Sequence, residues 1–152
     1  MSAQDSVRLS LRLLTTSRLI EREVDALMRA RFNATIARFD FMAALDRHGP
    51  LTLGEVSQHL LVSNGNVTQL RTRLEADGLI RTEADEKDRR VQRVRLTEAG
   101  ESVFKRMAKA HAARVDSLLG ELTQTDRLAL MRLLDGARAS IRRTLTKGDA
   151  AA

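Results

Sequence analysis

Cysteine, tryptophan and tyrosine are absent from this 152-residue chain, and proline occurs once. Without a thiol, the chain forms no disulfide and supports neither thiolate catalysis nor thiol-based redox sensing. Phenylalanine supplies the only aromatic rings of the phenyl or indole type, with 4 residues. Proteins that bind single-stranded nucleic acids usually stack the bases on aromatic side chains. If the partner is a nucleic acid, the composition therefore favours double-stranded DNA.

Long hydrophobic runs are also missing. No apolar segment approaches the ~20 residues that a membrane-spanning helix requires, and the N-terminus MSAQDSVRLSLRLL has charges where a signal peptide has its apolar core. We therefore expect a cytoplasmic protein without a membrane partner, folded as one compact unit. The net charge of +6 favours an anionic partner such as nucleic acid or an acidic membrane surface, although many soluble proteins are equally basic.

Helical periodicity covers most of the chain. A long amphipathic helix is expected over about 5–31, and a shorter one over about 35–47 that ends before the single proline. Thr52 and Glu55 have the spacing of a capping box, which begins a short helix that reaches about Leu60. The N-terminal half of the chain is thus predicted to be helical.

The next helix is predicted by SNGNVTQLRTRLEADG at 63–78, with Ser63 as its N-cap and Gly78 as its C-terminal stop. Its apolar stripe consists of Val67, Leu70 and Leu74. Only Leu61 and Val62 separate it from the preceding helix, which is the spacing of a helix-turn-helix whose second helix enters the major groove of DNA. The spacing alone fits an ordinary antiparallel pair of helices equally well.

The face opposite the apolar stripe carries short polar side chains in place of the Glu and Lys of a solvated surface. Short hydrogen-bonding side chains suit base edges, and flanking arginines suit phosphates. A glycine costs about 1 kcal/mol inside a helix, and Gly65 near the helix start would repay that cost by letting the backbone approach the groove. The candidate DNA-binding residues of this helix are Ser63, Asn64, Gly65, Asn66, Thr68, Gln69, Arg71, Thr72 and Arg73.

Two alternating, β-branched segments at 79–84 and 91–97 predict a β-hairpin. Val94 and Leu96 are expected to face the core, with the arginines at 93 and 95 outward. The turn DEKDRR at 85–90 contains no Asn-Gly, so we expect a long and mobile tip.

Cations gather at this predicted tip. An extended arm beside a helix-turn-helix can place an arginine in the minor groove, whereas the simpler interpretation is that the charges keep an exposed edge soluble. Asp88 lies two residues before Arg90 and is suited to hold its guanidinium by a charge-assisted hydrogen bond. The candidate DNA contacts of the hairpin are Lys87, Asp88, Arg89 and Arg90.

The order of these elements resembles the MarR family of winged helix-turn-helix transcriptional regulators. DRRVQRVRLTEAG at 88–100 is similar to the family's wing signature, Asp-x-Arg followed by an apolar-x-Leu-Thr-x-x-Gly run, and LTLGEVSQHLLVSNGNVTQLRTRLEADGLI at 51–80 resembles its helix-turn-helix. The resemblance implies a homodimer joined through its terminal helices and bound to a pseudo-palindromic operator. Thr72 stands where many members have an acid before the arginine that is here Arg73, which leaves the partner of Arg73 open.

The expected fold is mainly α with a small β-hairpin wing. A winged helix-turn-helix DNA-binding domain is predicted over 33–99, a helical dimerisation region over 1–32 and 100–146, and a disordered tail over 147–152. The last helix is expected to begin at a capping box in TQTD at 123–126. Three amphipathic helices flank a core too small to cover their apolar faces, and a second subunit can cover them.

No pattern in the sequence supports catalysis. His48, His59 and His111 stand apart, without H-E-x-x-H spacing or a serine triad, and no glycine-rich phosphate loop occurs. We therefore expect neither an enzyme nor a metal or cofactor site.

The family resemblance further implies that a small, often aromatic and anionic molecule lowers DNA affinity from a site between the dimerisation helices and the winged domain. An aromatic acid or its coenzyme A thioester fits this description. The planar fork of arginine suits a carboxylate or phosphate, and the candidates are Arg18, Arg22 and Arg38, although any single one is more commonly a solvated surface residue. Two alternatives stay open: a DNA-packaging protein without ligand response, and a helical protein-interaction adaptor.

Overall fold

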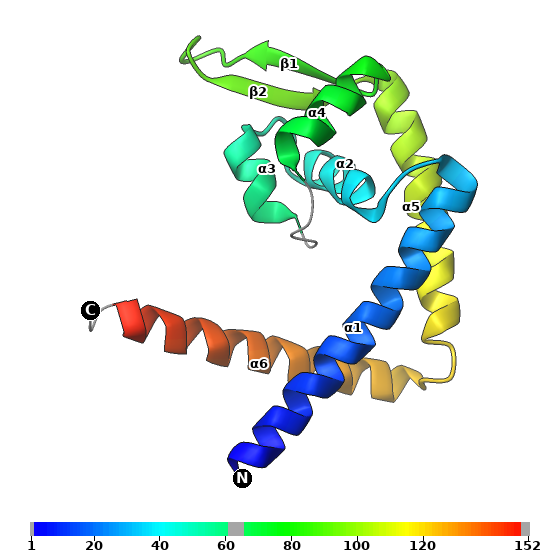
Figure 1. Ribbon diagram of the computed structural model, residues 1–152, viewed down its shortest axis with the longest axis vertical. Helices are drawn as coiled ribbons and strands as arrows, with labels where there is room; N and C mark the ends of the chain where they lie inside the picture. Colours follow the sequence, from blue (N-terminus) through cyan, green and yellow to red (C-terminus); the bar gives the residue numbers. More distant parts are fainter. Residues whose placement is uncertain (1, 61–65, 150–152) are drawn as a thin grey trace. The chain divides into compact units, whose positions relative to one another are not determined.

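The computed structural model describes residues 2–60 and 66–149 (Figure 1). Its contacts divide the chain into two units, residues 1–115 and 116–152. The elements in chain order are α1 (Ala3–Phe32), α2 (Ile36–His48), α3 (Leu53–His59), α4 (Val67–Ala76), β1 (Ile80–Ala84), β2 (Gln92–Leu96), α5 (Glu98–Leu118) and α6 (Gln124–Asp149). This confirms a mainly helical fold with one small hairpin.

Local capping signals begin the first three helices. Ser2 and Asp5 form a capping box at α1, and the Thr35 side chain accepts a hydrogen bond from the backbone of α2. The predicted box of Thr52 and Glu55 is present at the start of α3. These side chains satisfy N–H groups that have no partner within the helix.

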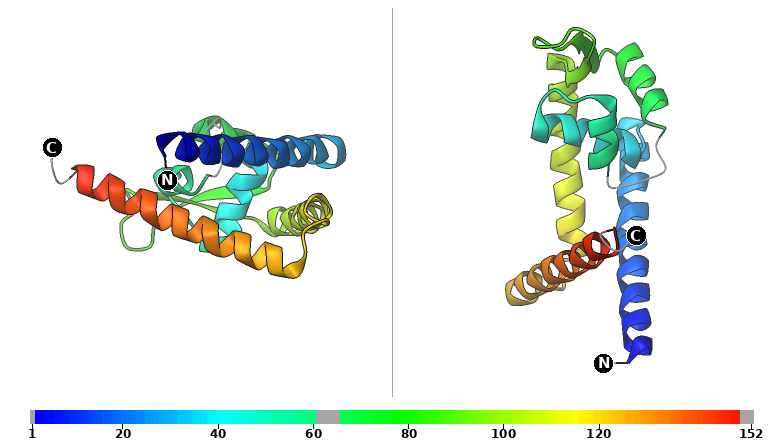
Figure 2. Two further views of the ribbon diagram at one scale, coloured as in Figure 1. Left: turned by 90° about the horizontal axis from the view of Figure 1, so that it is seen from below. Right: turned by 90° about the vertical axis from the view of Figure 1, so that its left-hand side faces the viewer.

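Helix α2 lies at the centre of the first unit and contacts α1, α3, α4 and β2. Its Phe41 and Met42 are completely buried, as are Met28 of α1 and Leu74 of α4. Because the C-terminal half of α1 supplies part of this core, α1 and the winged region fold as one unit. Figure 1 and the right-hand view of Figure 2 show the N-terminal half of α1 extending away from that core.

The hairpin pairs β1 with β2 in antiparallel register, with Thr82 opposite Val94. Leu51 adds a short bridge on the other edge of β2: its N–H donates to the Val94 carbonyl at 3.0 Å, and the Val94 N–H donates back at 2.7 Å. Val94 and Leu96 are buried, as predicted. The segment that links α2 to α3 therefore holds the middle of β2.

The Leu-Thr-x-x-Gly run joins the hairpin to α5 and has a packing explanation. The Thr97 hydroxyl accepts from the Gly100 N–H at 3.0 Å and donates to the Gly78 carbonyl at 2.6 Å. A Cβ at Gly100 would lie 1.9 Å from the Leu79 carbonyl oxygen, a distance that no packing adjustment of a side chain relieves. Threonine thus caps α5, and only glycine lets α5 approach the start of β1.

Helix α4 begins later than the sequence predicts. Asn66 is its N-cap, with an extended backbone and a side-chain oxygen that accepts from the Gln69 N–H at 3.1 Å. The expected N-cap Ser63 is therefore not the cap of α4, because asparagine fills that position at least as well. Ser63, Asn64 and Gly65 lie outside the described residues.

The second unit contains α6, which begins at the predicted capping box of Thr123 and Asp126. From the first turn of α6, the Arg127 guanidinium donates to the Asp116 carboxylate at 2.7 Å and to the Leu119 carbonyl at 2.9 Å. The helix continues to Asp149, whereas the sequence predicts a tail that begins at 147; residues 150–152 are outside the described part. Gly148 has low helix propensity, but it does not end α6.

Large apolar side chains remain exposed on two helices. In the single chain these side chains are between about one third and two thirds accessible to solvent. A single exposed leucine is ordinary, whereas many large apolar side chains exposed on one helix indicate an interaction surface. The exposed residues are Val7, Leu9, Leu11, Leu13, Leu14 and Leu19 on α1, and Leu128, Leu130, Met131, Leu133, Leu134, Ile141 and Leu145 on α6.

Candidate nucleic-acid interface

The polar face of α4 is open to solvent. Thr68, Gln69, Thr72 and Arg73 are all exposed, while Leu74 on the opposite side is completely buried. The Thr72 hydroxyl donates to the Thr68 carbonyl at 3.0 Å and keeps an acceptor lone pair for another partner. The helix therefore presents short polar groups outward, as the sequence pattern predicts.

The two arginines of α4 differ in their availability. Arg71 is half-buried, its Nε has no hydrogen-bond partner among the described residues, and that Nε lies 3.9 Å from the Glu75 carboxylate. Arg73 is exposed and makes no ion pair within the part of the chain that the structure describes. Arg73 is therefore the better candidate for a phosphate contact.

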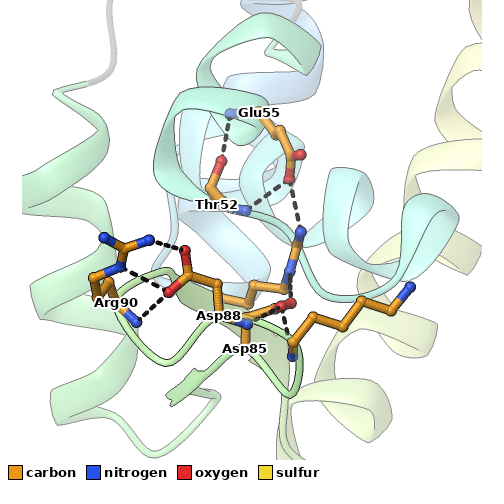
Figure 3. Close-up of polar contacts among 7 residues, drawn as sticks. Thr52, Glu55, Asp85, Asp88 and Arg90 are labelled. Carbon is orange, nitrogen blue, oxygen red and sulfur yellow. Dashed lines mark hydrogen bonds and ion pairs between the residues drawn. The ribbon is translucent and has the colours of Figure 1, made fainter.

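The hairpin tip is held by the Asp85 carboxylate, which accepts from the backbone N–H groups of Lys87 at 3.0 Å and Asp88 at 3.2 Å (Figure 3). The Asp85 N–H donates to the Val91 carbonyl at 2.8 Å. The tip is therefore a hydrogen-bonded turn over 85–91. Its length agrees with the prediction of a long tip, and its mobility stays a prediction. An aspartate that accepts from N–H groups just ahead of it in the chain replaces the missing Asn-Gly signal.

At this tip, Arg90 is held by Asp88, as predicted. The Nε and Nη2 atoms of Arg90 each donate to a different Asp88 oxygen at 3.0 Å (Figure 3). These bonds lower the pKa of Asp88 below its ordinary value and raise the pKa of Arg90. The Arg90 side chain is still 90% exposed, so a bidentate pair orients a fully accessible guanidinium.

Arg93 is not the outward-facing residue that alternation in the strand predicts. It is half-buried; its Nε donates to Asp85 at 2.5 Å, and its Nη1 donates to Glu55 of α3 at 3.2 Å. Arg95 does face outward, with a 3.5 Å ion pair to Glu83. Glu55 pairs with Arg93 although the two residues are 38 positions apart in the sequence. Strand periodicity carries no information on such a pairing.

A cavity of about 570 Å³ lies between α1, the start of α2, and α4. Of the three arginines that the sequence suggests for an anionic effector, Arg18 and Arg22 line this cavity and Arg38 does not. Arg38 instead forms an ion pair with Asp77, with 2.6 Å between Nη2 and Oδ2, whereas Arg22 has only a longer ion pair of 3.8 Å with Glu23. The complete lining is Arg18, Glu21, Arg22, Asp25, Arg29, Thr35, Ile36, Ala37, Asn66, Gln69, Leu70 and Arg73.

The charges of the cavity leave a cationic surplus. The Asp25 carboxylate accepts from the Arg29 Nε at 2.6 Å and from the Ile36 N–H at 2.8 Å. Burial alone would raise the pKa of Asp25, but these two bonds hold it below its ordinary value. Arg29 is thus paired with Asp25, and Arg22 lies 3.8 Å from Glu23. Arg18 and Arg73 make no ion pair among the described residues, so two unpaired arginines on the lining face the single carboxylate of Glu21.

A second carboxyl near α1 is buried in the core. Asp40 of α2 is 8% exposed, and its Oδ2 has no hydrogen-bond partner in the described part of the chain. Burial, together with the charge of Glu21, raises the pKa of Asp40 to about 6. Ionised Asp40 therefore lowers the stability of the folded protein, and no hydrogen bond to its Oδ2 within the described residues offsets that loss.

Comparison with known proteins places this geometry in a family. A model of the MarR family matches residues 33–91. The chain is 31% identical over 106 residues to the HTH-type transcriptional regulator YkoM of Bacillus subtilis, covering 70% of this chain and 68% of that protein. A crystal structure of a MarR family regulator from Silicibacter pomeroyi matches with a TM-score of 0.79 and 30% identity over 93% of this chain and 99% of that one. The chain belongs to the MarR family.

Another similar structure is that of Bordetella bronchiseptica BpsR, whose DNA binding is regulated by 6-hydroxynicotinic acid. It matches with a TM-score of 0.68 and 25% identity, over 82% of this chain and 90% of that one. MarR-family proteins bind double-stranded DNA and act as dimers. Membership makes this protein a DNA-binding transcriptional regulator and not an enzyme.

Two observations on the described residues accompany this assignment. No helix among them is long and apolar enough to cross a membrane. Within the same residues, histidines and acids form no group of three or more that could hold a metal ion.

Proposed function

We propose that this MarR-family regulator is a repressor that recognises a pseudo-palindromic operator and leaves it when a small aromatic anion binds. The observation that carries the proposal is the sharing of residues between two surfaces. Asn66, Gln69 and Arg73 belong to the polar face of α4 and also line the arginine-rich cavity. A ligand in that cavity would therefore act on the residues that DNA needs.

Base readout in this proposal falls to Asn66, Thr68 and Gln69. The Asn66 side-chain oxygen is occupied by the cap of α4, so its amide group is left to donate. Arg73 and the tip residues Lys87 and Arg89 would contact phosphates, and Arg90, oriented by Asp88, would enter the minor groove. Ser63, Asn64, Gly65, Arg71 and Thr72 complete the proposed DNA-binding set.

A second copy of the chain would cover the apolar faces of α1 and α6. Exposed leucines on both helices supply the hydrophobic surface, and burial contributes about 25 cal/mol per Å² of apolar area. A two-fold dimer would set its recognition helices in major grooves roughly 10 base pairs apart. The 1–32 and 100–146 segments are accordingly proposed as the dimerisation region, and 33–99 as the DNA-binding domain.

The proposed effector is an aromatic carboxylate or its coenzyme A thioester. The DNA binding of BpsR, a relative of this chain, is regulated by an aromatic acid. Arg18 and Arg22 line the cavity, and an arginine can bind a carboxylate with paired N–H donors. The effector lowers operator affinity only if it binds the DNA-free arrangement of α4 better than the bound one. A typical coupling of 1–3 kcal/mol corresponds to roughly 5–150-fold in operator affinity.

Readout is tested by single substitutions on α4. Thr68→Ala or Gln69→Ala should cost ~1–3 kcal/mol on the operator and little on random DNA, measured by mobility shift. Gln124→Ala, which truncates an exposed glutamine of α6, is the matched control and should change neither. Equal losses on both DNAs for the α4 variants would remove base readout and favour a packaging protein.

The effector is tested by calorimetric titration with 6-hydroxynicotinate and with benzoyl coenzyme A. Arg18→Ala should weaken binding, whereas Arg12→Ala, another exposed arginine of α1 that does not line the cavity, should leave it unchanged. Binding without any change in operator affinity, or no binding of either probe, would refute a ligand-released repressor.

A further inference from the structure

The Glu55 carboxylate connects two elements of the winged domain. Its Oε2 accepts from the Thr52 N–H at 2.8 Å, which completes the capping box of α3, and also from Arg93 Nη1 at 3.2 Å (Figure 3). One oxygen therefore serves both the start of α3 and strand β2. The bond to Thr52, and the charge of Arg93, lower the pKa of Glu55 below its ordinary value.

Arg93 carries this connection onward to the hairpin tip. Its Nε donates to Oδ1 of Asp85 at 2.5 Å, while Oδ2 of Asp85 accepts from the N–H groups of Lys87 and Asp88. Asp88 in turn holds Arg90. The contacts form an unbroken chain from the start of α3 to the exposed guanidinium at the tip.

Other contacts fix the hairpin elsewhere. The Leu51–Val94 bridge holds the middle of β2, and the Thr82 hydroxyl donates to the Glu75 carboxylate of α4. Neither of these contacts reaches the turn at 85–90. Arg93 is the residue that ties that turn to α3, and its rigid, planar fork fixes direction as well as distance.

We propose that Glu55, Arg93 and Asp85 form a wing strut whose role is to aim the hairpin tip at DNA, with Arg93 acting as a positioning residue and not as a phosphate contact. The inference rests on the proposed DNA-binding role of the tip. By its charge alone, Arg93 would be classed with the exposed arginines of the wing. The strut gives it a different role.

The test uses the direction in which operator affinity changes when an acidic charge is removed. Removing an acid near DNA normally strengthens binding, because it reduces repulsion of the phosphates. Glu55→Gln keeps an acceptor for the Thr52 N–H, since glutamine also completes a capping box, but it loses the charge that holds Arg93. We expect operator affinity to fall about tenfold, which corresponds to ~1.4 kcal/mol.

The matched control is Glu86→Gln, which also removes one acidic charge, here from the hairpin tip itself. Glu86 is exposed and has no hydrogen-bond or ion-pair partner among the described residues, so this variant should bind the operator as tightly as the natural protein or more tightly. Arg93→Lys should weaken binding because an amine cannot span both acids in this geometry, whereas Arg81→Lys, an exposed arginine of β1, should not.

A measurement without DNA separates the strut from the DNA-binding proposal. The chain has no cysteine, so Gln58→Cys on α3 and Ala84→Cys on the hairpin can be spin-labelled specifically. Pulsed electron paramagnetic resonance should give a narrow distance distribution that Glu55→Gln broadens and Glu86→Gln does not. Thermal unfolding of each variant shows whether it is folded.

The outcomes are distinct. A broadened distance with no operator preference in the natural protein would retain the strut and refute the proposed function. An unchanged distance in Glu55→Gln, or operator binding in Arg93→Lys equal to that of the natural protein, would overturn the strut.

Discussion

Replacing Asp40 by asparagine should stabilise the protein in a pH-dependent manner. The carboxyl is 8% exposed and its Oδ2 has no partner among the described residues. Burial and the charge of Glu21 raise its pKa from 3.8 to about 6. A folded-state pKa above the unfolded value means that the folded protein binds more protons than the unfolded chain between these two values.

The magnitude follows from that difference. Each unit of pKa is worth about 1.4 kcal/mol, so ionised Asp40 costs about 3 kcal/mol at pH 8 and about 1 kcal/mol at pH 4.5. Asparagine has nearly the same shape and does not ionise, but its amide also needs partners, which offsets part of the gain. We therefore expect Asp40→Asn to be more stabilising at pH 8 than at pH 4.5 by about 2 kcal/mol.

The assay is urea unfolding followed by circular dichroism, because the chain has no tryptophan or tyrosine to report by fluorescence. Protein concentration must be equal throughout, since a dimer's stability depends on it. Asp46→Asn, an exposed aspartate of the same helix, is the control and should show little effect. A difference that does not change with pH, or a loss of stability at pH 8, would refute the cost assigned to Asp40 and indicate a partner for its carboxylate.

Three other predictions concern packing, assembly and the wing. Gly100→Ala should lower the free energy of unfolding by more than ~2 kcal/mol, because its Cβ would lie 1.9 Å from the Leu79 carbonyl oxygen. A Cβ at Gly136 on α6 meets open space, so Gly136→Ala should stabilise the protein by about 0.5–1 kcal/mol. Thermal unfolding distinguishes the two variants. Deleting 124–152 should abolish the dimer, and a truncated protein that still sediments as a dimer would place the interface elsewhere. Arg90→Ala should weaken binding to all DNA and flatten its salt dependence by about the contribution of one cation; a salt slope equal to that of the natural protein would argue against Arg90 in the minor groove.

Local sequence signals were sufficient for most of the fold. The capping boxes at Thr52 and Thr123 and the alternation around Val94 depend on residues within a few positions of one another, and all three are present in the structure. The start of α4 was missed because Ser63 and Asn66 are both good N-caps, and propensity does not choose between them. Local signals thus fix the kind of element better than its first residue.

Long-range pairings account for what the sequence did not show. Its residue type makes Arg38 a candidate for binding an anionic ligand, but it pairs with Asp77. Arg93 has the alternation of a solvated strand residue, but it pairs with Glu55. The partners lie 39 and 38 positions away, and each pairing depends on how α2, α3, α4 and the hairpin pack together. Periodicity carries no information on such contacts.

The most direct test of the account is a mobility shift of the natural protein on the DNA upstream of its own gene and on a scrambled duplex of equal length, at two salt concentrations. A sequence-specific regulator should bind the upstream DNA at least ~10³-fold more tightly than the scrambled duplex, with both affinities falling as salt rises. Equal affinity for the two duplexes would contradict operator recognition and leave a packaging protein, and the absence of salt-dependent binding would leave an adaptor.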